Sequence, residues 1–187
     1  MLPYIRKEHY PNLLQTHDWG KATSTFEIGQ EAAPEPLISN VNIVPFIGEK
    51  CVLIRLDNGN WEMPGGTLEP NEHFLSTVKR ELLEEAGAAL VSPFTAFGAW
   101  KFLSTAEEPY RPHLPHPLYY RVVGFGDVEL VSAPIIPGDG GEQVVAVEAM
   151  ALPEAKQAFI DSGRSDLAEL YELADFLRRS ATNTQTS

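Results

Sequence analysis

Three glutamates at helical spacing, Glu81, Glu84 and Glu85, are the residues of this chain best placed to do chemistry together. At about 100° per residue around a helix axis, their side chains fall within one arc of about 100°. Like charges at such spacings cost about 0.2–0.5 kcal/mol per pair on an isolated helix, and more where water is partly excluded. A divalent cation removes that cost, because clustered carboxylate oxygens are the ligands that Mg²⁺ and Mn²⁺ prefer. The spacing therefore indicates a metal site, with a solvated acidic helix face as the alternative.

A longer pattern of fixed residues encloses these acids. It runs Gly66, five residues, Glu72, seven residues, Arg80-Glu81, a bulky apolar residue, any residue, Glu84-Glu85, any residue, Gly87. At every fixed position this pattern resembles the signature box of the Nudix hydrolases. Ala88 is smaller than the aliphatic residue usual there, and Pro70-Asn71 replaces smaller residues, but neither departure removes a ligand. The resemblance covers about 23 of 187 residues.

The resemblance implies a fold and a metal site. The fold would be α/β, the Nudix-type α/β/α sandwich with a mixed β-sheet between helices. The cofactor would be Mg²⁺, or Mn²⁺ in its place. Its implied ligands are the carbonyl of Gly65 and the side chains of Glu81, Glu84 and Glu85. Arg80 would orient these groups by pairing with Glu72 or Glu84, and would not itself react.

The reaction implied by the resemblance is hydrolysis of a pyrophosphate bond in a nucleoside diphosphate linked to another moiety. A nucleoside triphosphate and a nucleotide sugar are equally open as substrates, and the protein would be a Nudix pyrophosphohydrolase acting on acid anhydrides. Relatives use either a box glutamate or a loop glutamate as general base. Glu84 and Glu142 are therefore both candidates, with Asp139 and Glu148 behind them. For Glu142 the alternative is a plain surface acid.

Two other functions are weighed against catalysis. A non-catalytic nucleotide-binding Nudix-like sensor is the main alternative, but the box is intact and no basic helix-turn-helix stretch is present. An isomerase that uses the same fold would need a cysteine near the site, and Cys51 precedes the box in a predicted core strand. Both comparisons favour a hydrolase.

The composition restricts partners and location. The net charge is −12, and no basic stripe is present to release counterions from a nucleic acid, so we expect no nucleic-acid partner. Cys51 is the single cysteine, which suits a reducing cytoplasm and a packing role. No apolar run approaches the roughly 20 residues of a membrane span, and we expect neither a signal peptide nor a membrane partner.

The elements that must position the site follow from periodicity and turn residues. We expect a helix from Pro70 or Asn71 to Gly87, and an amphipathic helix over residues 165–179. Strands are expected over residues 22–28, 41–45, 51–54, within 90–103, and over 118–125 and 143–150. The chain would divide into an N-terminal extension (1–37), a Nudix hydrolase domain (38–180) and a disordered tail (181–187).

Candidate substrate-binding residues lie outside the box. They are Arg55, Trp61, Arg111 and Tyr119. Arg111 lies in a Pro-rich loop that could contact a phosphate or a base, and a solvated loop is the alternative. Strand register decides whether Tyr119 or Tyr120 faces the cleft. Aromatic residues before position 38 could stack on a base, cover the domain, or pack on a partner subunit in a homodimer.

Overall fold

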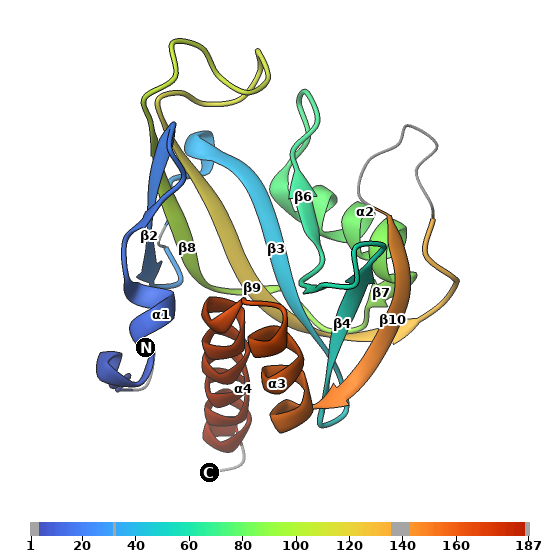
Figure 1. Ribbon diagram of the computed structural model, residues 1–187. Coiled ribbons are helices and arrows are strands. Elements are labelled where there is room, and N and C mark those ends of the chain that lie inside the picture. The colour runs from blue at the N-terminus through green and yellow to red at the C-terminus, as the bar shows by residue number, and fades with distance from the viewer. Residues whose placement is uncertain (1–3, 32, 136–142, 186–187) are drawn as a thin grey trace.

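A mixed β-sheet forms the centre of the protein, in a computed structural model that describes residues 4–31, 33–135 and 143–185 (Figure 1). The main strands run in the order β1 (His17–Asp18), β2 (Ala22–Ile28), β8 (Thr95–Ser104), β9 (Leu118–Leu130), β3 (Ile38–Ile47), β4 (Lys50–Leu56) and β10 (Val144–Ala151). Three short strands pair with this sheet: β5 (Trp61–Glu62) with β4, β6 (Gly65–Thr67) with β3, and β7 (Ala88–Leu90) with β9. The pair β3–β9 is parallel and its neighbours are antiparallel, which confirms the mixed sheet.

Helices cover both faces of the sheet. On one face lie α1 (Pro11–Leu14), α3 (Leu152–Asp161) and α4 (Ser165–Gln185), and on the other lies α2 (Phe74–Ala86) (Figure 1). Two short 3₁₀ helices, Lys7–His9 and Glu35–Leu37, complete the described elements. Each face has its own buried apolar cluster, so the predicted α/β/α sandwich is confirmed.

The residues of β3 show why the sheet is covered on both faces. Val44 and Phe46 pack in the cluster beneath α3 and α4, whereas Val41 and Ile43 pack in the cluster beneath α2. Successive side chains of a strand point to opposite faces, so a strand that is buried at nearly every position needs two covered faces. β3 also pairs with β6, and it thereby holds the Gly-Gly segment in place.

The first 37 residues contribute to the same layers. β2 pairs with β8 along its whole length, from Ala22 opposite Ser104 to Ile28 opposite Gly98. Helix α1 contacts α4, where the carboxylate of Glu169 accepts hydrogen bonds from the Asn12 side chain (2.5 Å) and the Leu13 backbone N–H (2.8 Å). The predicted strand over residues 22–28 is confirmed.

The start of α2 differs from the prediction. The helix begins at Phe74, not at Pro70 or Asn71, and Asn71 has a left-handed φ of 63°. His73 is the N-cap, and its Nδ1 accepts a hydrogen bond from Leu75 N–H at 3.2 Å. Residues 69–72 form a turn instead, in which Glu72 N–H donates to the Glu69 carbonyl at 3.0 Å. At the other end Gly87, with φ 58°, ends the helix as predicted.

The last helix is longer than its apolar pattern. α4 continues to Gln185, beyond the predicted end at Arg179, and includes residues 181–185, which were expected to be disordered. Extending an existing helix adds one hydrogen bond per residue fixed, so polar residues can continue it after the packing face ends. In the part of the chain that the structure describes, no helix is both long enough and apolar enough to cross a membrane.

Candidate active site

The Gly-Gly segment lies against both β3 and α2. A Cβ at Gly65 would lie 2.3 Å from the Val41 carbonyl oxygen, and a Cβ at Gly66 would lie 2.0 Å from Oε1 of Glu81. Both distances are far shorter than a carbon atom allows. Glycine is therefore required here by close approach, and this approach brings the backbone of β6 directly against the box carboxylates.

Arg80 links the turn, β6 and the helix. Its Nε and Nη2 donate to the two carboxylate oxygens of Glu72, both at 3.0 Å, and Nη2 also donates to the Thr67 carbonyl at 3.1 Å. Its Nη1 donates to Glu81 at 2.7 Å and to Glu84 at 3.2 Å. The hydrogen bonds from Arg80 lower the pKa of Glu72 to about 2. A two-point pair of this kind fixes the guanidinium plane, so Arg80 holds the box acids relative to β6.

The three box glutamates differ in exposure. Glu81 is 9% exposed, and burial raises its pKa although Arg80 opposes the shift. Glu85 accepts a hydrogen bond from Gly65 N–H at 2.9 Å. Burial, with the nearby charges of Glu81 and Glu84 adding to it, raises the pKa of Glu85 to about 8. The Glu84 side chain is 43% exposed. The site is thus a partly buried group of acids with too little positive charge around it.

The donor chemistry of this group suits a hard divalent cation. It consists of carboxylate oxygens beside a Gly-Gly backbone, which are the ligand types that Mg²⁺ and Mn²⁺ prefer. In the described ranges, no three His, Cys, Asp or Glu side chains converge as metal ligands do. The reason is visible in the contacts: Arg80 holds Glu81 and Glu84, and Glu85 turns to the Gly65 amide. The residue types fit the ion, and their carboxylates would have to turn from Arg80 and the Gly65 amide to bind it.

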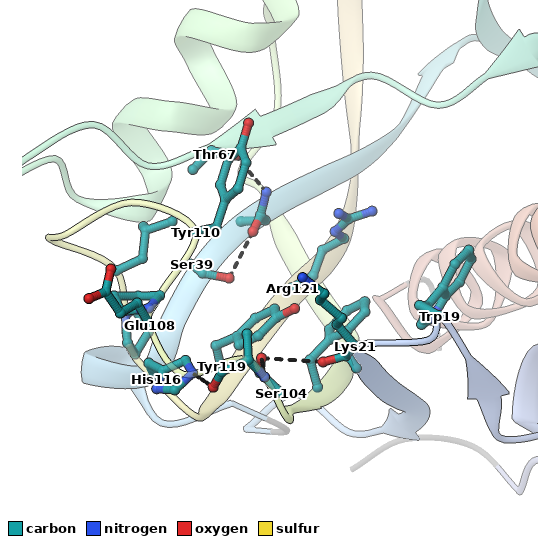
Figure 2. Close-up of a pocket in the computed structure, with 17 residues that line it drawn as sticks. Trp19, Lys21, Ser39, Thr67, Ser104, Glu108, Tyr110, His116, Tyr119 and Arg121 are labelled. Atoms are coloured by element: carbon teal, nitrogen blue, oxygen red, sulfur yellow. Dashed lines mark hydrogen bonds between the residues drawn. The ribbon is translucent and has the colours of Figure 1, made fainter.

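A cavity of about 430 Å³ lies beside β6 (Figure 2). Its lining comes from the start of β2, from β3, β6, β8 and β9, and from the loop of residues 105–117. Tyr119 lines this cavity, whereas Tyr120 is 6% exposed and packs under α2. The register of β9 therefore places Tyr119, and not Tyr120, at the cavity.

The other candidate substrate residues lie elsewhere. Arg111 pairs with Glu69 at 3.3 Å, and its guanidinium lies 5.8 Å from the ring centre of Tyr110. The guanidinium of Arg55 lies 5.9 Å from the ring centre of Trp61. None of Arg55, Trp61 and Arg111 lines the cavity.

Of the three acidic residues considered as general base outside the box, the structure describes one. Glu142 and Asp139 lie outside the described residues. Glu148 is exposed on β10, where it pairs with Leu53 of β4. The choice between Glu84 and Glu142 as general base stays a prediction.

Sequence reasoning missed Arg121, Lys21 and Phe102, which line the cavity. A signal for Arg121 was present: it is the one charged residue in the run Leu118 to Phe125, two positions after Tyr119 and therefore on the same face of β9. Lys21 and Phe102 carried no comparable signal, because the turn before β2 reaches this cavity only through the pairing of β2 with β8.

Comparison with known proteins assigns the family. The family model described as NUDIX domain matches residues 36–172. A Caenorhabditis elegans protein named as a nudix hydrolase is 32% identical over 89 residues, covering 48% of this chain and 33% of that protein. A MutT-like protein of Streptomyces ambofaciens is 42% identical over 62 residues, covering 31% and 40%. The chain therefore belongs to the Nudix family, while the matched part spans well under half of each of these relatives.

A solved structure supports the same fold. The Bacillus subtilis pyrophosphohydrolase BsRppH superposes with a TM-score of 0.55 at 19% identity, covering 85% of this chain and 97% of that one. At this identity the likeness establishes the fold.

Proposed function

We propose that this protein is a Mg²⁺-dependent Nudix hydrolase that cleaves a pyrophosphate bond in a nucleoside diphosphate linked to another moiety. The observation that carries the proposal is the packing of Glu81 and Glu85 against Gly65-Gly66, with Arg80 holding Glu81 and Glu84. Acids this close together and this poorly compensated are costly to folding alone. Their arrangement is explained if they serve to bind a cation.

Each box residue has a role in this proposal. Glu81, Glu84, Glu85 and the carbonyl of Gly65 would hold Mg²⁺ or Mn²⁺. When bound, the ion supplies positive charge that offsets the negative charge on the phosphoryl oxygens and lowers the pKa of an attacking water. Arg80 keeps the carboxylates in position through its pair with Glu72. Glu84, whose side chain is 43% exposed, or Glu142 would accept the proton from that water.

The name of the structural neighbour agrees with this activity. BsRppH is described as a pyrophosphohydrolase. The substrate's second moiety, the cytoplasmic location and the homodimer stay predictions, since they rest on the sequence.

The test is product release from a panel of nucleoside triphosphates and nucleotide sugars, with Mg²⁺ and with EDTA. We expect turnover with Mg²⁺ and none with EDTA. In Glu84→Gln and Glu85→Gln the turnover rate should fall about a hundredfold or more. Glu148→Gln serves as the matched control, because Glu148 is an exposed acid on β10. Activity that persists in EDTA and in both the Glu84→Gln and Glu85→Gln variants would refute the proposed mechanism.

Two further outcomes separate the remaining alternatives. Full activity in Glu142→Gln would leave Glu84 as the general base. Nucleotide binding without any turnover across the panel would identify a sensor in place of an enzyme.

A further inference from the structure

The cavity beside β6 has an aromatic and cationic wall that the box does not use. Phe102 of β8 stacks on Tyr119 of β9, with ring centres 5.0 Å apart and planes within 3°. The guanidinium of Arg121 lies 5.7 Å from the centre of the same Phe102 ring. Figure 2 shows Tyr119 and Arg121 rising from β9, with Lys21 near the start of β2. Strands β8 and β9 and the turn before β2 therefore build this wall together.

Arg121 has a buried polar atom without a partner in the part of the chain that the structure describes. Its Nε is inaccessible to solvent and has no hydrogen-bond partner, and none of the ion pairs among the described residues involves Arg121. Burial lowers the pKa of Arg121. The carboxylate whose charge reaches it, Glu62, is already hydrogen-bonded to Arg164. A guanidinium in this position is costly unless an anion joins it.

The charges around the cavity favour an anionic ligand. Lys21 and Arg121 both line it, and Glu108, on the exposed loop, is the single acid among the lining residues. The whole chain carries a net charge of −12, so a cavity with more cations than acids is contrary to the general composition. A neutral ring alone would leave Arg121 uncompensated, whereas an anion would not.

The cavity adjoins the box through Thr67. The Thr67 hydroxyl accepts a hydrogen bond from the Asn40 side chain at 2.8 Å, and both residues line the cavity. The Thr67 carbonyl accepts a hydrogen bond from Arg80, which holds the box glutamates. A volume of about 430 Å³ lies within the range of pockets that hold small organic ligands. A substrate with its diphosphate at the box can therefore extend into this cavity.

We propose that the cavity binds the part of the substrate beyond the scissile diphosphate, and that Arg121, with Lys21, selects substrates in which that part carries a phosphate monoester. This inference rests on the proposed function and specifies its substrate class. Arg121 is the specificity-determining residue, and the Phe102–Tyr119 pair gives the apolar side of the same subsite.

The first experiment measures equilibrium binding by titration calorimetry in EDTA, where no turnover occurs. Two matched pairs serve as probes, NADPH against NADH and coenzyme A against dephospho-coenzyme A, because each pair differs by one phosphate monoester. We expect the wild type to prefer the phosphorylated member of at least one pair by about tenfold or more. Equal affinities within both pairs would overturn the proposal.

Variants assign the preference to its residues. Arg121→Gln should abolish the preference, and Arg121→Lys should retain part of it. Lys21→Gln should reduce it, and since Lys21 is exposed this variant tests the proposal even if Arg121→Gln fails to fold. Lys101→Gln is the matched control, because Lys101 is next to Phe102 on β8 but pairs with Glu27. A preference that persists in both Arg121→Gln and Lys21→Gln would refute the assignment.

Hydrolysis of the same compounds with Mg²⁺ separates this inference from the proposed function. A phosphate preference in EDTA, with no hydrolysis of these compounds or of the nucleotide panel in Mg²⁺, would support the subsite and contradict the enzyme. Hydrolysis of both members at equal kcat/KM, with equal binding, would support the enzyme and contradict the subsite.

Discussion

Glu72→Gln is expected to lower the free energy of unfolding at neutral pH, and this difference from the wild type should vanish in acid. The Glu72 carboxylate lies in the turn before α2 and receives two hydrogen bonds from Arg80, each 3.0 Å long. Glutamine keeps one acceptor oxygen and the shape of the side chain but loses the charge. The variant therefore isolates the contribution of the ionised group to the free energy of unfolding.

The magnitude follows from the pKa of Glu72, which the hydrogen bonds from Arg80 lower from 4.5 to about 2. That difference corresponds to about 3 kcal/mol of stabilisation by the ionised form. Because the Arg80 side chain is 28% exposed and that of Glu72 14%, solvent screening reduces the expected effect to about 2 kcal/mol. A lowered pKa stabilises the fold fully above the unfolded value of 4.5, and the stabilisation is lost as pH falls towards about 2.

Urea unfolding of the wild type and the variant, measured at intervals from about pH 7 to about pH 2.5, checks this prediction. The wild type should be more stable by about 2 kcal/mol near neutrality, and the difference should fall below about 1 kcal/mol at the acid end. Glu69→Gln is the control, because the Glu69 side chain is 55% exposed and its pair with Arg111 should contribute less than about 1 kcal/mol. A Glu72→Gln difference that does not change with pH would refute the reasoning.

Two further changes test the site and the N-terminal segment. Gly66→Ala should displace Glu81, because an oxygen of Glu81 lies 2.0 Å from the position of the added carbon. In a steady-state assay kcat should therefore fall about ten- to a hundredfold, while the circular dichroism spectrum stays that of the wild type. Wild-type activity in this variant would contradict the close approach. Glu169→Ala should lower the free energy of unfolding, measured in urea, by about 2–3 kcal/mol, because it leaves the buried Leu13 N–H unpaired. The control Glu172→Ala removes a half-exposed pair with Lys156 and should lower it by less than about 1 kcal/mol. Equal losses in the two variants would contradict the role of Glu169.

The box could be predicted from the sequence because its chemistry is local. The spacing of Glu81, Glu84 and Glu85 on a helix fixes their common side, and Gly87 fixes where the helix ends. The pairing of Arg80 with Glu72 and Glu84 also lies within one short segment. The strands on either side were predicted from apolar and β-branched residues, which depend on near neighbours.

The start of α2 was predicted wrongly for a local reason that the pattern did not contain. Pro70 and Asn71 are common residues at helix starts, but here they belong to a turn that places Glu72 opposite Arg80. The hydrogen bonds between Arg80 and Glu72, eight residues apart in the same segment, decide against the preference of Asn71 to cap the helix.

The sequence by itself determined the family resemblance and the acidic helix, because both depend on spacing within one short segment, and the layers of the fold were inferred from that resemblance. Only the tertiary structure decided which residues line the cavity. Lys21, Phe102 and Arg121 are far apart in the chain and meet because β2 pairs with β8, and β8 with β9. Strand register places each side chain on one face or the other, and that register is set by contacts between distant segments.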